Sequence, residues 1–270
     1  MNMLTMLCGA VVGLSLGLTG GGGDIFAVPL LVYALGVDPR AAIGVSLVTV
    51  GLTSFVGFAQ RLPLGAVEIR TGLLFAVSGM LTAPLGSWLA ARLPESLLLI
   101  TFATLMLFIA ARMWRKAGDA SERLPLACAN EPGPTCRRDP QGVLHLSSRC
   151  ALLLGLVGMV SGLMTGLFGV GGGFIIVPAL VLFSGMRIQK AVGTSLLVIS
   201  LVSASGVASW LAAERALPWQ VVGWFVLGSV VGLSIGGKLA LRLGGPTLQR
   251  VFAVAILGVG LFVIVRNLAH

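Results

Sequence analysis

The chain has 270 residues, of which 57% are hydrophobic and only 10% are charged, and its mean hydropathy is +1.03. A soluble domain carries about 25% charged residues, so the composition excludes a soluble enzyme or binding module and indicates an integral membrane protein. The formal net charge of +9 does not indicate nucleic-acid binding, because basic residues that flank apolar segments are topology determinants of membrane proteins.

Apolar segments fall into two groups of five, separated by a polar stretch rich in proline, glycine and charge. The first group is 3–20, 25–36, 41–60, 70–91 and 96–114; the second is 150–168, 174–185, 191–213, 219–241 and 247–268. We expect an all-α integral membrane protein, each repeat having a glycine-broken helix pair plus three spanning helices. The predicted parts are a first membrane repeat over 1–116, a cytoplasmic linker over 117–149 and a second membrane repeat over 150–270.

The second group of segments repeats the first. The phrase GLTGGGGDIFAVPLL at residues 17–31 returns as GLFGVGGGFIIVPAL at residues 166–180. When 17–50 is aligned with 166–199 at a constant offset of 149, 14 of the 34 positions are identical, including most of the glycines and the shared proline. Unrelated apolar segments would not share these positions, so we infer an internal duplication.

The distribution of basic residues predicts how the two repeats are oriented. If each glycine break lay inside one spanning helix, the repeats would be parallel, with 11 of the 18 basic residues inside and 7 outside. If the chain turns back at the glycines, the repeats are inverted and the split is 14 to 4. Because cytoplasmic loops carry an excess of Lys and Arg, the count favours two inverted-topology repeats. It leaves open whether 25–36 and 174–185 re-enter or cross a thinned bilayer.

The glycine breaks are the candidate site. The short segments that follow them, beginning at Ile25 and Phe174, would form only ~18 Å of helix, too little to cross comfortably. Unpaired backbone groups at membrane depth are tolerated only where they line a cavity or are buried in protein. The first turn of a helix presents free N–H groups and a partial positive charge, which bind an anion without a basic side chain. We expect the breaks to meet near the midplane, as in transporters for small anions.

Side chains around the breaks have two interpretations each. Pro29 and Pro178 either initiate the short helices or shape the site. The hydroxyls of Ser46, Thr194 and Ser195 either contact the anion or belong to small residues that allow close helix packing.

Asp24 is the only carboxylate deep in an apolar segment. One interpretation is an N-cap of the short helix, whose carboxylate accepts N–H groups from the next turn. The other is a proton-coupling site, because an ionisable group within the membrane is a functional candidate by default. If capping occupies the free N–H groups of the first break, the break of the second repeat is the better anion site.

Other candidate chemistry is weak. Cys128, Cys136, His145 and Cys150 follow one another at spacings of 8, 9 and 5, without a C-x-x-C pair, so we expect no metal site. A cytoplasmic loop would keep these thiols reduced. The predicted membrane segments contain no histidine and the chain has no P-loop, so we expect neither an enzyme nor ATP hydrolysis, and no cofactor.

The repeated motifs carry a family resemblance. Each glycine-rich phrase ends in a proline, and GVSL or GTSL begins fifteen residues after that proline. This pattern, present in both halves, resembles the TauE/SafE family of sulfite exporters. The resemblance implies a multi-pass protein of the inner membrane that binds sulfite, thiosulfate or an organosulfonate. Candidate substrate-binding residues are Gly20, Gly21, Gly22, Gly23, Ser46, Gly169, Gly171, Gly172, Gly173, Thr194 and Ser195. Candidate structural residues are Pro29, Pro178, Gly44 and Gly193.

We therefore expect a secondary transporter that moves a small sulfur-containing anion by alternating access. The alternative is an anion channel with a glycine-lined constriction. Its expected partners are the anion and the lipid bilayer, not nucleic acid, and a homodimer is left open. In one respect the chain departs from the repeated pattern, because Asp24 occupies the place that Gly173 has in the second repeat.

Overall fold

The structure is a computed structural model, and it describes residues 2–21, 23–94, 97–102, 104–107, 148–184, 186, 188–213, 217–240 and 258. Within these residues every regular element is a helix and none is a strand. Six of the helices are long and apolar enough to cross a membrane, which confirms the predicted all-α membrane class. The predicted linker and the segment 247–268 lie outside the described residues, except for 148, 149 and 258.

The two halves contain corresponding sets of helices. The first half has α1 (Asn2–Thr19), η1 (Gly23–Phe26), α2 (Ala27–Pro29), η2 (Leu30–Ala34), α3 (Pro39–Arg61) and α4 (Ile69–Arg92). The second half has α6 (Ser148–Phe168), α7 (Gly173–Ser184), α8 (Ile188–Ala212) and α9 (Trp219–Ala240). Residues 97–102 and 104–107 are also helical. At the offset of 149, α1 corresponds to α6, α3 to α8 and α4 to α9.

Local sequence accounts for the start of α3. Gly36 has a φ of +66°, a conformation that glycine adopts cheaply, and it ends the short helical stretch. Asp38 follows, and its Oδ2 accepts hydrogen bonds from the backbone N–H groups of Arg40 at 3.0 Å and Ala41 at 3.2 Å. Pro39 occupies the first helical position, where its missing N–H has no partner to lose.

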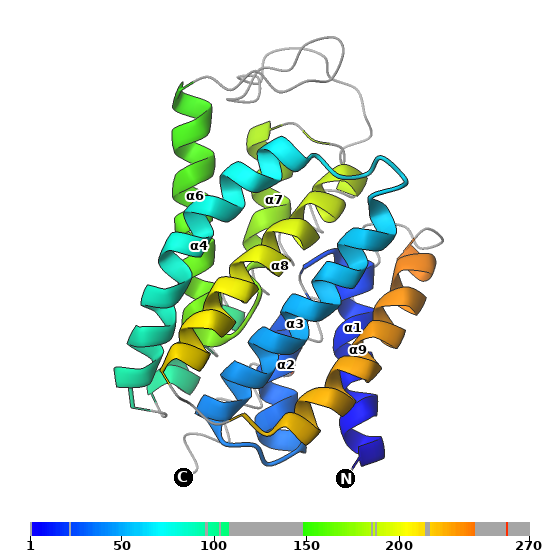
Figure 1. Ribbon diagram of the computed structural model, residues 1–270, viewed down its shortest axis with the longest axis vertical. Coiled ribbons are helices and arrows are strands. Elements are labelled where there is room, and N and C mark those ends of the chain that lie inside the picture. The colour runs from blue at the N-terminus through cyan, green and yellow to red at the C-terminus, as the bar shows by residue number, and fades with distance from the viewer. Residues whose placement is uncertain are drawn as a thin grey trace.

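The chain turns back at each glycine break. In Figure 1, α1 rises from the end marked N, and the stretch containing α2 leads back down to where α3 begins. In the second half, α6 descends from the opposite end, and α7 leads back up towards the start of α8. Each break with its flanking helices is therefore a hairpin that opens towards one end of the bundle.

Two glycine-rich helices, α1 and α9, pack side by side in the same direction. Gly9 lies against the backbone of Phe225, and Gly17, two turns later, lies against Leu233. The Ser229 hydroxyl donates a hydrogen bond to the Gly9 carbonyl at 3.0 Å. A Cβ added to either glycine would overlap backbone atoms of α9. Small residues at this spacing let membrane helices approach closely, and we call this contact the α1–α9 seam.

The corresponding helices of the other pair, α4 and α6, pack in the same way. Gly158 lies against Phe75, and Gly166 lies against the carbonyl oxygen of Ala83. The Thr82 hydroxyl donates across this contact to the Met159 carbonyl at 2.7 Å. The first helix of each half therefore packs on the last described spanning helix of the other half.

The central pair, α3 and α8, runs in opposite directions. Leu47 near the start of α3 lies against Gly206 near the end of α8, and Gly57 near the end of α3 lies against Leu196 near the start of α8. The helices α3 and α8, which correspond at the offset of 149, therefore run antiparallel at the centre of the bundle.

The outer helices follow the direction of the central helix on which they pack. Gln60 in the last turn of α3 donates a hydrogen bond at 3.2 Å to Ser234 in the last two turns of α9, so α3 and α9 are parallel. The start of α4 meets the start of α8, where the Glu68 N–H donates to the Thr194 hydroxyl at 2.9 Å. Thus α1, α3 and α9 run one way and α4, α6 and α8 run the other.

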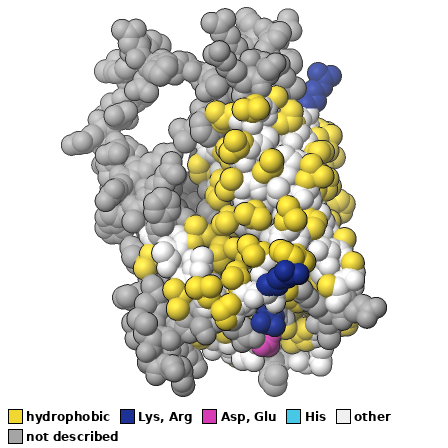
Figure 2. All heavy atoms as spheres, turned by 90° about the vertical axis from the view of Figure 1, so that its left-hand side faces the viewer, with side chains coloured by type: hydrophobic (Ala, Val, Ile, Leu, Met, Phe, Trp, Pro, Cys, Tyr) yellow, Lys and Arg dark blue, Asp and Glu magenta, His cyan; other side chains and the backbone are white. Residues whose placement is uncertain are grey.

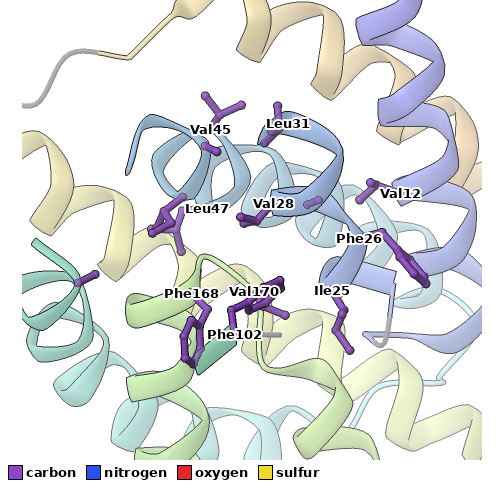
Figure 3. Close-up of a cluster of buried hydrophobic side chains, with 14 of the residues drawn as sticks. Val12, Ile25, Phe26, Val28, Leu31, Val45, Leu47, Phe102, Phe168 and Val170 are labelled. Carbon is purple, nitrogen blue, oxygen red and sulfur yellow. The ribbon is translucent and has the colours of Figure 1, made fainter. Parts of the chain in front are cut away.

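The short helices of the first half are buried between the two repeats. Ile25 and Leu31 are almost fully buried, and Figure 3 shows Ile25 in one cluster with Phe168 and Val170 of the second half. Phe168 contacts the Phe102 ring with a centroid distance of 5.5 Å. Burial of its first part, Asp24–Pro29, in protein makes a short broken helix tolerable at membrane depth.

The outer surface suits a lipid environment. Figure 2 shows hydrophobic side chains over the middle of one face, with basic side chains towards its upper and lower parts. Large exposed apolar side chains include Leu73, Leu81 and Trp88 of α4. In water such a surface would drive aggregation, whereas in a bilayer it is the expected contact with lipid.

The α1–α9 seam generates a stability prediction. We expect Gly13→Ala to destabilise the protein by about 1–3 kcal/mol, because the new methyl group would overlap the backbone of Ser229 on α9. The matched control is Gly223→Ala on α9, where a Cβ meets nothing within 4 Å. Thermal unfolding of the purified proteins in detergent measures both. Equal melting temperatures for the two variants would contradict the seam.

Candidate functional site

The two glycine breaks meet inside the bundle. A Cβ built on Gly21 would lie 2.5 Å from the Gly173 Cα, so their backbones touch and leave no room for a side chain. Gly20 and Gly169, which are equivalent at the offset of 149, have φ values of +73° and +68°. Gly172 has a φ of +63°. Side chains other than glycine would be strained at these three positions.

A pair of equivalent serines ties each break to the other repeat. The Ser46 hydroxyl on α3 donates to the Gly169 carbonyl at 2.6 Å, and the Ser195 hydroxyl on α8 donates to the Gly20 carbonyl at 2.5 Å. Both serines are buried. Their hydroxyl protons are therefore occupied by backbone carbonyls that the glycine breaks would otherwise leave unpaired.

Thr194 lies away from the breaks. Its Oγ1 accepts the N–H of Glu68 at the start of α4. Two further glycines make packing contacts: Gly44 lies against the Trp210 indole, and Gly193 lies against the Ala66 carbonyl. Gly44 thus joins the two central helices, and Thr194 and Gly193 join α8 to residues at the start of α4.

The short helices begin earlier than the sequence suggested. The first starts as the 3-10 turn Gly23–Phe26 and continues as α2 (Ala27–Pro29), and the second starts at Gly173. Pro29 is the third residue of α2, within its first turn, and Pro178 is the sixth residue of α7. The structural role of both prolines stays a prediction. A proline there removes a backbone donor, and after Pro29 the chain continues as the π-helix Leu30–Ala34.

Asp24 does not cap a helix. It lies inside η1, which begins one residue before it, and its backbone partner is Gly171 of the other repeat rather than the next turn of its own helix. The N-cap interpretation is therefore wrong, because the helix starts before the aspartate rather than after it. The side chain is fully buried.

The Asp24 carboxylate lies against the break of the second repeat. A Cβ added to Gly171 would overlap its Oδ2, and would also meet Ile199 at 2.5 Å and Val50 at 2.8 Å. Val50 is the middle residue of α3 (Pro39–Arg61), and Ile199 lies one residue from the middle of α8 (Ile188–Ala212). Asp24 and Gly171 thus lie together at mid-depth of the bundle.

Sequence reasoning missed a group of buried hydroxyls on the central helices. Thr49, Thr53 and Ser54 on α3 and Ser203 on α8 are buried, and their hydroxyls have no hydrogen-bond partner within the described residues. Buried polar groups without partners are costly, so these hydroxyls differ from ordinary packing residues of a membrane helix. The sequence signal was available, because Ser54 and Ser203 are equivalent at the offset of 149.

Two residues assigned simpler roles have additional contacts. Arg61, expected mainly to set topology, donates through Nη2 to the Gly17 carbonyl at 3.3 Å, an interaction that stabilises the C-terminal end of α1. Cys150 is disulfide-bonded. The expectation of a reduced thiol, which depended on a cytoplasmic location of the loop, is therefore wrong for Cys150.

The chain is similar to a known protein family and to several known membrane proteins. Residues 5–263 match the family model described as Sulfite exporter TauE/SafE. A probable membrane transporter protein of Xylella fastidiosa (strain Temecula1) is 33% identical over 99% of this chain and 96% of its own length. The probable membrane transporter protein YunE of Bacillus subtilis is 26% identical over 88% of this chain and 86% of its own length. No solved structure matches the chain.

The family match spans both halves, both glycine breaks and all six long apolar helices. The relatives are named as membrane transporters and are covered over nearly their full length. The chain is a multi-pass membrane protein that belongs to the TauE/SafE sulfite exporter family.

Proposed function

We propose that the protein is a secondary transporter that moves a small sulfur-containing anion across the inner membrane by alternating access. The observation that carries this proposal is the contact of the two glycine breaks, Gly21 against Gly173, inside a bundle of six long apolar helices. The sulfite-type substrate class, covering sulfite, thiosulfate and organosulfonates, is supported by the family.

The chemistry of the breaks suits an anion. Each break leads into a short helix, at Gly23 and at Gly173, and the first N–H groups of a helix carry a partial positive charge. Glycines let an anion approach this backbone without a side chain in the way. The proposed binding residues are Gly20, Gly21, Gly22, Gly23, Gly169, Gly171, Gly172 and Gly173, and Gly22 lies outside those described.

Alternating access is supported by the opposite directions of the two repeats. Counterpart helices run antiparallel, as in transporters whose inverted repeats rock against each other around a midplane site. The basic residues agree with this orientation: Arg61 and Lys238 lie at the end where α3 and α9 finish, and Arg40 and Arg92 lie at the other. The first end would be cytoplasmic under the charge count of the whole chain.

The energy source follows from the charge of the substrate. A monoanion that leaves the cytoplasm gains about 2.3 kcal/mol per 100 mV of membrane potential. Export of the anion alone therefore needs no coupling ion, whereas uptake would.

Counterflow in liposomes tests the site. We expect Gly171→Ala to abolish exchange of labelled sulfite or thiosulfate, because the added methyl would overlap Asp24 and crowd Val50 and Ile199. Gly155→Ala on α6 is the matched control, since a Cβ there meets nothing within 4 Å, and it should transport normally. Normal counterflow by a correctly inserted Gly171→Ala protein would rule out this site, and flux without counterflow would indicate a channel.

The serine pair generates a second test. Ser46 and Ser195 are each the eighth residue of antiparallel helices, so their hydrogen bonds to the breaks lie on opposite sides of the midpoint. We expect Ser46→Ala and Ser195→Ala to shift the balance of inward- and outward-facing states in opposite senses. A buried hydrogen bond contributes about 1 kcal/mol, which corresponds to about a fivefold change in the ratio of apparent affinities from the two sides.

Transport assays in right-side-out and inside-out vesicles measure that ratio. An identical change in affinity from both sides, for both variants, would show that the serines only support packing.

A further inference from the structure

We propose that the Asp24 carboxylate is a tethered anion that competes with the substrate at the second glycine break, and that the substrate binds when Asp24 takes up a proton. The proposal rests on the proposed function, because it concerns the same anion site. It assigns the coupling ion as a proton and places its carrier on the first repeat, opposite the glycines of the second.

Asp24 lies where the two glycine breaks meet. Asp24 belongs to the break of the first repeat, but its Oδ2 lies against Gly171 of the second, at the midpoint of α3 and α8. Its equivalent in the second repeat is Gly173, which has no side chain to offer. The two breaks are therefore unequal: only one of them supplies a carboxylate, and that carboxylate reaches into the other.

Within the described residues no charged side chain neutralises Asp24. It is fully buried, and the group that it meets is the backbone of Gly171. A buried carboxylate without a counter-ion is costly. The favourable surroundings on offer are the backbone of the second break at Gly171 and the start of α7 at Gly173, where a negative charge is stabilised.

Charged groups on the surrounding elements do not reach Asp24. The titratable groups near or on α1, α2, η2, α3, α7 and α8, within the described residues, are Cys8, Tyr33, Asp38, Arg40, Arg61 and Lys190. None of them forms a hydrogen bond or an ion pair with Asp24. Arg61 donates to the Gly17 carbonyl at the end of α1, and Arg40 lies at the start of α3, about half a helix length from Val50.

The charge of the Asp24 carboxylate affects binding of the substrate anion, because both are negative. A substrate anion at Gly171 would stand beside the Asp24 carboxylate, and two negative charges in a buried site repel. A protonated Asp24 removes the repulsion and gains an O–H donor. The unpartnered hydroxyls of Thr49 and Thr53 on α3 offer this region further donors and acceptors.

The consequence for transport is a change of driving force. Because coupling between two ligands is reciprocal, anion binding promotes proton uptake by Asp24 as much as the proton promotes anion binding. A monoanion and one proton would cross together with no net charge, whereas a dianion such as thiosulfate and one proton would carry one negative charge. Transport of a monoanion would then respond to the pH gradient, and hardly to the membrane potential.

Equilibrium binding across pH tests this inference. The probe is thiosulfate, whose charge does not change between pH 5.5 and 8, titrated by calorimetry into the detergent-solubilised wild type, Asp24→Asn and Asp24→Gly. The last variant restores the residue type of the second repeat. The control is Asp38→Asn, at the exposed cap of α3. Two buffers of different ionisation heat report the protons taken up.

The wild type and Asp38→Asn should lose affinity by up to about tenfold per pH unit as pH rises, with up to one proton taken up per anion. Both Asp24 variants should bind with the same affinity at every pH and take up no proton. Wild-type binding that does not depend on pH, or pH dependence that survives in a folded Asp24 variant, would overturn the inference while leaving the anion site intact. Failure of every sulfur anion to bind the wild type would instead contradict the proposed function.

Discussion

A helix that breaks at membrane depth must find partners for its freed backbone groups, because lipid offers none. In this protein each break finds them in the other repeat: Ser46 donates to Gly169, and Ser195 donates to Gly20. Because each repeat supplies the hydrogen-bond donors for the break of the other, neither repeat would be a stable structure on its own. The backbone contact between Gly21 and Gly173 at mid-depth of the bundle follows from this mutual arrangement.

The glycines of the chain serve two physically different purposes. In the α1–α9 seam they lie within regular helices and let two helices approach until backbone meets backbone. In the breaks they take positive φ values and end a helix. The first kind joins a helix of one repeat to a helix of the other on each side of the bundle, and the second interrupts the helices at its centre.

The sequence predicted the fold well because two strong signals agree: apolar length sets the spanning helices, and the repeat offset of 149 sets the correspondence between halves. The Asp38–Pro39 pair is a sequence signal for the start of α3 at Pro39. The sequence could not show that Asp24 faces Gly171, since this contact joins residues far apart in the chain. The N-cap interpretation of Asp24 failed because the helical turn begins at Gly23, one residue before the aspartate. The sequence did not single out the buried hydroxyls of Thr49 and Thr53, because only the structure shows that a threonine in an apolar helix lacks a hydrogen-bond partner.

The most direct test of the account is thermal stabilisation of the purified protein by a panel of anions, measured in parallel on the wild type and on Gly171→Ala. A ligand that binds only the folded state raises the melting temperature according to its concentration relative to its dissociation constant. The account predicts selective stabilisation of the wild type by sulfite, thiosulfate or an organosulfonate over chloride and acetate, and no stabilisation of Gly171→Ala. Equal stabilisation of the two proteins, or none by any sulfur anion, would contradict a binding site between the two glycine breaks.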